Sequence, residues 1–152
     1  GLAGGTAKAT SSWTVITDNS AGYILTIEAT TSPALKSSSG ASFGDYVTAN
    51  ADPDFVFAVN AASSTFGFSP EGTHITSRFK DNGSVCNTGA GDTSDRCYAG
   101  LSTTPQTVAS SQSANAPGGT ETTARFAAGV GASKIQDSGT YQATVIVTAI
   151  AQ

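Results

Sequence analysis

A single histidine, His74, limits the nucleophilic chemistry that this chain could perform. A Ser-His-Asp or Cys-His arrangement needs an imidazole as its general base, so any such site would have to include this residue. Its neighbours Gly72, Thr73 and Ile75 are typical of the start of a strand, and the sequence has no nucleophile-elbow pattern. We therefore interpret His74 as a surface or strand-edge imidazole, and we predict a protein that is not an enzyme and uses no cofactor.

Acidic residues form two clusters that could bind a hard cation such as Ca²⁺ through carboxylate oxygens. Asp92 and Asp95 lie in one polar segment, and a second segment contains Asp45, Asp52 and Asp54. Neither cluster has the spacing of an EF-hand loop. We predict no metal site, and a cation near Asp92 and Asp95 stays open as an alternative.

The two cysteines, Cys86 and Cys97, lie in a loop rich in Gly, Asn and Asp. A local disulfide is the favoured interpretation, and it indicates an oxidising compartment. In the chain-entropy picture such a short loop gains about 3 kcal/mol of stability on closure. Two reduced buried thiols are the alternative. In an exported protein, Asn82 of the Asn-Gly-Ser triplet at 82–84 would also be a candidate for glycosylation.

Charge and hydropathy exclude two classes of partner. Lys and Arg total 7 against 11 Asp and Glu, so no basic face is available for nucleic acid. No stretch approaches the roughly 18 consecutive apolar residues of a membrane span. We expect neither a nucleic-acid partner nor a membrane-spanning segment.

Alternation of apolar and polar residues with a period of two recurs along the chain, and it predicts β-strands. The predicted strands are 13–17, 23–29, 54–60, 65–69, 75–80, 105–113, 120–130 and 139–152. The first two should form a hairpin. About eight short strands favour an all-β fold, a two-sheet antiparallel sandwich of immunoglobulin-like or jelly-roll type. We expect residues 1–152 to form one domain with a core that includes Trp13, Leu25, Phe57 and Phe68.

The last predicted strand, 139–152, is apolar on both faces. Tyr141, Val145 and Val147 lie on one face, whereas Ile146 and Ile150 lie on the other. A strand of this kind is either central in a sandwich or covered by another chain. We predict that these five residues form the contact between identical subunits.

Two segments carry a resemblance to known families. The Asp-x-Gly-x-Tyr pattern at 137–141 resembles the turn into a late strand of immunoglobulin-like sandwiches, where the tyrosine hydroxyl bonds back to the backbone. The pattern Gly-Thr-Tyr-x-x-Thr-Val-x-Val-Thr at 139–148 resembles the C-terminal strand of bacterial pilin and spore-coat-U-type subunits. The Trp-x-Val and Asp-Asn-Ser-Ala-Gly-Tyr-x-Leu-x-Ile patterns within 13–27 are similar to segments of exported filament and surface proteins. These resemblances imply a secreted sandwich that polymerises by donating a strand to a neighbour.

The N-terminal segment departs from the pilin pattern. Chaperone-assembled pilins carry an N-terminal donor with alternating large apolar residues, whereas residues 1–12 offer only Leu2. We expect residues 1–12 to be flexible or exchanged between copies. Residues 145–150 are then the best candidate for the donated strand, unless the subunits join face to face.

The sequence thus favours an extracellular, pilin-like structural subunit whose partners are identical subunits. The alternative is a carbohydrate-binding or adhesive module of the cell surface. Such a module could contact glycans or host surfaces through exposed tyrosines, for which Tyr46 and Tyr98 are the candidates.

Overall fold

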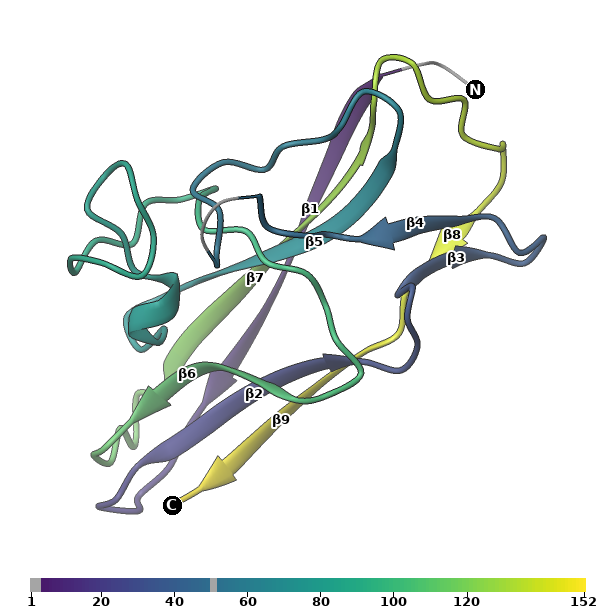
Figure 1. Ribbon diagram of the computed structural model, residues 1–152. Coiled ribbons are helices and arrows are strands. Elements are labelled where there is room, and N and C mark those ends of the chain that lie inside the picture. The colour runs from purple at the N-terminus through teal and green to yellow at the C-terminus, as the bar shows by residue number, and fades with distance from the viewer. Residues whose placement is uncertain (1–3, 50–51) are drawn as a thin grey trace.

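The computed structural model describes residues 4–49 and 52–152 as a sandwich of two β-sheets (Figure 1). The strands are β1 (Gly5–Val15), β2 (Tyr23–Ala29), β3 (Leu35–Ser37), β4 (Ser42–Asp45), β5 (Ser64–Glu71), β6 (Gln106–Ser111), β7 (Thr120–Val130), β8 (Tyr141–Gln142) and β9 (Val145–Ala151). One sheet has the order β1-β7-β5-β4-β3-β8, and the other has the order β6-β2-β9. The predicted all-β sandwich is confirmed, with nine strands in the described residues and one parallel pair, β4 with β5.

The two strands with the clearest alternation form where the sequence predicts them, at 23–29 and 120–130. In β2, Tyr23, Leu25, Ile27 and Ala29 are buried and the residues between them are half-buried. This is the burial pattern of a strand with one face on the core.

The N-terminal strand differs from the prediction. β1 pairs with β7 in antiparallel register from Gly5 opposite Val130 to Val15 opposite Thr120. The part of the 1–12 segment from Gly5 onward is therefore strand rather than flexible chain, and residues 1–3 lie outside the described residues. The expected hairpin of 13–17 with 23–29 is wrong, because β1 and β2 belong to different sheets.

Other predicted strands are replaced by loop structure. Residues 54–60 form no strand, and residues 75–80 contain the 3₁₀ turn η1 (Ser77–Phe79). The long C-terminal strand is divided, because β8 joins the larger sheet and β9 joins the smaller one.

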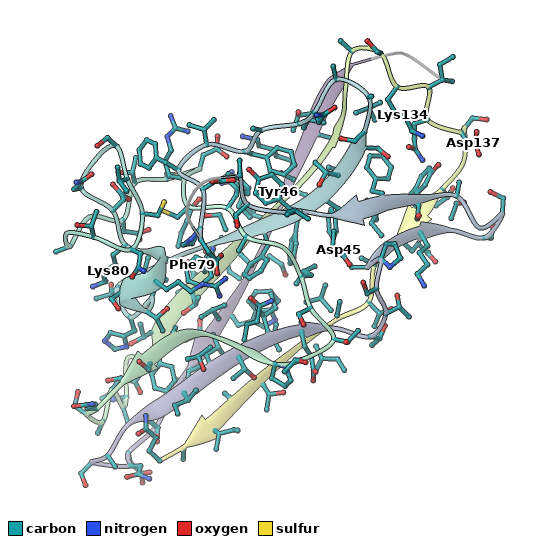
Figure 2. All side chains as sticks on the ribbon, viewed as in Figure 1. Asp45, Tyr46, Phe79, Lys80, Lys134 and Asp137 are labelled. Carbon is teal, nitrogen blue, oxygen red and sulfur yellow. A yellow bond between two sulfur atoms is a disulfide. The ribbon has the colours of Figure 1, made fainter. Side chains whose placement is uncertain are left out.

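Side chains fill the space between the sheets (Figure 2). Leu25 and Phe68 are fully buried in this core, and Trp13 packs against the core from a half-buried position. Phe57 is half-buried in a smaller cluster with Tyr46 and Tyr98, where it stacks on the Tyr46 ring at 5.0 Å. In the described part of the chain, no helix is long and apolar enough to cross a membrane.

Candidate functional site

Each sheet has an open edge on the same side of the sandwich. β1 ends the order of the larger sheet and β9 ends the order of the smaller one, so each strand has a neighbour on one side only. A groove of about 380 Å³ lies between these strands. It is lined by Ser11, Trp13, Leu35, Phe66, Phe126, Ala143 and Val145. The molecule therefore presents apolar interior side chains beside two unpaired strand edges.

Small residues on β1 keep this groove open. Side chains alternate along a strand, so Ala7, Ala9 and Ser11 face the same way as Trp13, toward the interior. All three are exposed, because no second sheet covers them. Across the ladder, Ala9 is opposite Phe126, which stays half-buried although it faces the core.

The opposite face of β1 is held by a network of charges. Lys8 donates to both carboxylate oxygens of Asp95, at 2.7 and 2.6 Å. Arg125 Nε donates to Glu71 Oε1 at 2.8 Å, and the same oxygen accepts the Asp95 backbone N–H at 3.0 Å. The network thus connects β1, β5, β7 and the disulfide loop.

Hydrogen bonds and charges in this network stabilise the ionised carboxylates. Burial raises the pKa of Glu71, but hydrogen bonds from Arg125 and the Asp95 amide outweigh this effect, so the pKa is lowered. Burial likewise opposes ionisation of Asp95, and hydrogen bonds from Lys8 and Tyr98 lower its pKa. These carboxylates are partners of fixed donors, so they hold the loop against the sheet.

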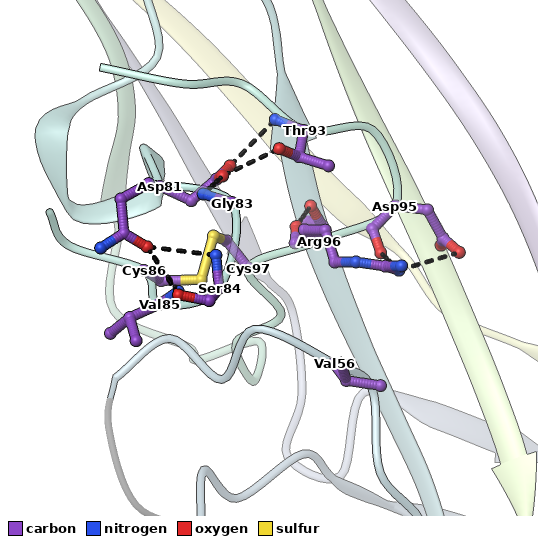
Figure 3. The surroundings of a disulfide bond; sticks show 12 residues. Val56, Asp81, Gly83, Ser84, Val85, Cys86, Thr93, Asp95, Arg96 and Cys97 are labelled. Carbon is purple, nitrogen blue, oxygen red and sulfur yellow. Dashed lines mark hydrogen bonds and ion pairs between the residues drawn. A yellow bond between two sulfur atoms is a disulfide. The ribbon is translucent and has the colours of Figure 1, made fainter. Parts of the chain in front are cut away.

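The loop itself is closed by the predicted disulfide, which is confirmed between Cys86 and Cys97, both buried (Figure 3). Beside it, the buried Asp81 carboxylate accepts hydrogen bonds from Gly83 N at 2.7 Å and from Thr93 N and Oγ1 at 2.9 and 2.8 Å. Burial raises the pKa of Asp81, and these hydrogen bonds lower it by more. Asp81 therefore organises the loop around the disulfide.

The candidate cation ligands have protein partners instead. Asp95 binds Lys8, and Asp92 accepts the Gly72 backbone N–H at 2.7 Å. In the other cluster, Asp45 accepts the Ala34 N–H, Asp52 pairs with Arg78, and Asp54 accepts the Tyr46 hydroxyl. Within residues 4–49 and 52–152, no group of three His, Cys, Asp or Glu side chains could hold a metal ion.

Tyr46 and Tyr98 occupy more enclosed positions than the sequence indicates. Tyr46 and Tyr98 are 6% and 0% exposed, so the expectation that they are exposed glycan contacts is wrong. They lie under the loops that cover the outer face of the larger sheet, together with Ala127 of β7. The His74 Nδ1 atom is 3.0 Å from the hydroxyl of Tyr23, the first residue of β2.

The five predicted subunit-contact residues divide into two groups. Tyr141, Val145 and Val147 pack against the core of their own chain. The Tyr141 hydroxyl donates to the Asp137 carbonyl at 2.8 Å, which is the bond to the backbone that the Asp-x-Gly-x-Tyr pattern implies. Ile146 and Ile150 are 43% and 55% exposed on the outer face of β9.

The sequence predicted Val145 as a contact residue and Trp13 as a core residue. It did not place either in a groove with the other apolar lining residues, which come from separate strands: Leu35, Phe66 and Phe126. The small residues of 5–12 give no large apolar alternation, so the sequence offered no clear signal that this segment is an edge strand. No family model, curated protein or solved structure matches the chain.

Proposed function

We propose that this protein is the structural subunit of an extracellular filament, in which a strand from a second copy covers the groove between β1 and β9. The observation that carries the proposal is the groove itself, with its apolar lining and an open strand edge on either side. Native proteins normally protect long edges with proline, bulges or several charged side chains, lysine above all. Along β1 the register is unbroken for eleven residues, and Lys8 is its only charged side chain.

The physical gain from such a contact has two parts. An added strand satisfies backbone N–H and C=O groups along the open edge. Its apolar side chains would also cover Trp13, Phe126 and Val145, and each large apolar side chain moved out of water contributes about 1.5–3 kcal/mol. Neither part requires a chemical step, so the proposed structural role needs no enzymatic activity.

The disulfide supports export. A cysteine pair closed across a surface loop is typical of proteins from oxidising compartments such as the cell exterior. A net charge of −4 on 152 residues also permits close packing of many copies with little repulsion.

The pairing of β9 with β2 disfavours donation of β9 to a second copy. All seven residues of β9 pair with β2, and the Gln152 backbone N–H donates to Gly22 at 3.1 Å beyond the end of the strand. Donation of 145–150 would break these bonds before it could form new ones. A strand added to the open side needs no such exchange, and we favour it.

The test is a variant that fills the groove from within. Ala143 lines the groove and is half-buried, whereas its neighbour Thr144 is exposed. Ala143→Trp should abolish polymer formation in sedimentation and negative-stain electron microscopy, and Thr144→Trp, its matched control, should polymerise normally. Equal polymer formation by a folded Ala143→Trp protein, verified by circular dichroism, would refute the groove as the contact.

A further inference from the structure

The inward-facing residues of β1 change in size along the strand. From the N-terminal end they are Gly5, Ala7, Ala9, Ser11, Trp13 and Val15. The first four are small, and the last two are large. A strand with this gradient is complementary to a reversed copy of itself, because reversal places large residues beside small ones.

We propose that the strand covering the open side is β1 of a second copy, paired antiparallel to β1 about a two-fold axis at Thr10. This inference rests on the proposed function, since it names the segment of the second copy that reaches the groove. Thr10 is the midpoint of Gly5–Val15, so this register pairs all eleven residues of each strand. The two six-stranded sheets then become one continuous sheet.

Size complementarity along the interior face favours this register. Trp13 is opposite the partner's Ala7, and Val15 is opposite the partner's Gly5. Large side chains therefore never oppose each other, and each indole extends over the part of the groove that small residues leave uncovered. Cross-strand neighbours of this kind are the contacts that stabilise a sheet.

Charge and polarity on the other face agree with the same register. Lys8 is opposite the partner's Ser12, which places the two lysines four residues apart, or about 14 Å at 3.4 Å per residue. Lys8 also keeps its own counter-ion, Asp95. At the axis, Thr10 meets the partner's Thr10, a pair that is favourable across antiparallel strands.

A two-fold contact joins only two copies, so a filament requires a second contact. The outer face of the smaller sheet is available for it. There Ile150 of β9 is exposed and lies opposite Ile24 of β2, and Ile146 is exposed on the same face four residues earlier in β9. The β1 contact and this face are on different surfaces, and they can be disrupted separately.

The experiment is site-directed disulfide formation. In the proposed register, Thr10→Cys places two cysteines directly opposite each other, within the Cα separation of 4.4–6.8 Å that a disulfide requires. The control, Thr14→Cys, places its two cysteines eight residues apart, about 27 Å at strand spacing. Mild oxidation should convert most of the Thr10→Cys protein, and little of the Thr14→Cys protein, to a covalent dimer.

A charge on the interior face provides an independent measurement. Ala7→Glu puts a carboxylate beside the partner's Trp13, and it should raise the dimer dissociation constant at least tenfold in analytical ultracentrifugation. Thr6→Glu on the opposite face should leave this constant within about threefold of the native value.

Equal cross-linking of the two cysteine variants, or no effect of Ala7→Glu, would overturn the β1 pairing. If filaments form but the Thr10→Cys protein does not cross-link, the β1 pairing is wrong and the proposed filament function stands. If the Thr10→Cys protein cross-links but no filament forms, the β1 pairing stands and the proposed filament function is wrong.

Discussion

Lys8 of β1 and Asp95 of the disulfide loop form an ion pair with Nζ–Oδ distances of 2.7 and 2.6 Å, although they are 87 residues apart in sequence. This contact joins the exposed N-terminal half of β1 to the loop that the Cys86–Cys97 disulfide closes. Asp95 also accepts the hydroxyl of the buried Tyr98 and lies 3.8 Å from Arg125. The loop thereby holds the edge strand in the position where a second copy would meet it.

The two partners of this ion pair should differ in their effect on stability. Lys8 is one-third exposed, and exposed ion pairs contribute about 0–1 kcal/mol, so Lys8→Ala should lower the free energy of unfolding by less than about 1 kcal/mol. Asp95→Ala should cost about 2 kcal/mol, because it also leaves the buried Tyr98 hydroxyl without its acceptor. Urea unfolding followed by tryptophan fluorescence measures both. Equal losses would show that Asp95 acts only as the counter-ion of Lys8.

Acid should destabilise the protein through the same network. The pKa values of Glu71, Asp95 and Asp81 are lowered from ordinary values of 4.5, 3.8 and 3.8. Groups of this kind contribute fully above their unfolded pKa, and the contribution is lost as the pH falls through the folded pKa. The free energy of unfolding should thus be constant near neutrality and decline below about pH 4.5. Glu71→Gln should flatten this decline, and an unchanged profile would exclude Glu71 as a contributor.

Alkali should destabilise the smaller aromatic cluster of Tyr46, Phe57 and Tyr98. Burial raises the pKa of Tyr46 to about 12, and burial together with the Asp95 carboxylate also raises the pKa of Tyr98. A raised phenol pKa gives stability that is complete below the unfolded value of 10 and is lost as the pH rises. Absorbance titration at 295 nm should show these tyrosines ionising well above pH 10 in the folded protein and near pH 10 in denaturant. Titration near pH 10 in the folded state would mean that the cluster is open to solvent.

Removal of the disulfide should loosen the loop that supports β1. Cys86→Ser with Cys97→Ser opens a loop with a sequence separation of 11, which should cost about 3 kcal/mol in the chain-entropy picture. Hydrogen exchange should also increase at residues 81–97 and in the N-terminal half of β1. The Asp81→Asn variant is the control, because it weakens the hydrogen bonds that order the loop and leaves the disulfide intact. Loss of stability without faster exchange in β1 would separate the loop from the edge strand.

The sequence predicted correctly the strands in which apolar and polar side chains alternate between the core and solvent. Alternation in 23–29 and 120–130 reflects one face on the core, and both strands form with those bounds. Residues 5–12 gave no such signal, because their side chains are small and exposed and the strand exists through its ladder with β7. The segment 54–60 alternates for a different reason, since Phe57 packs as part of a loop against Tyr46 and Tyr98.

The candidate site was predictable in outline only. An uncovered apolar interior followed from the two-faced C-terminal segment, and Val145 does line the groove. The groove's other walls depend on which strands neighbour each other, and this is set by contacts between residues far apart in sequence, such as Ala9 with Phe126. The alternation pattern contains no information about that pairing, so β1 could not be identified as the open edge.

The most direct test of the account is the mass and shape of the native protein as a function of concentration. Sedimentation velocity combined with negative-stain electron microscopy, from micromolar to millimolar protein, should show concentration-dependent assembly that ends in filaments of uniform width. A protein that stays monomeric over this whole range, with its disulfide intact and its fold verified, would contradict the central claim that a second copy completes the sandwich.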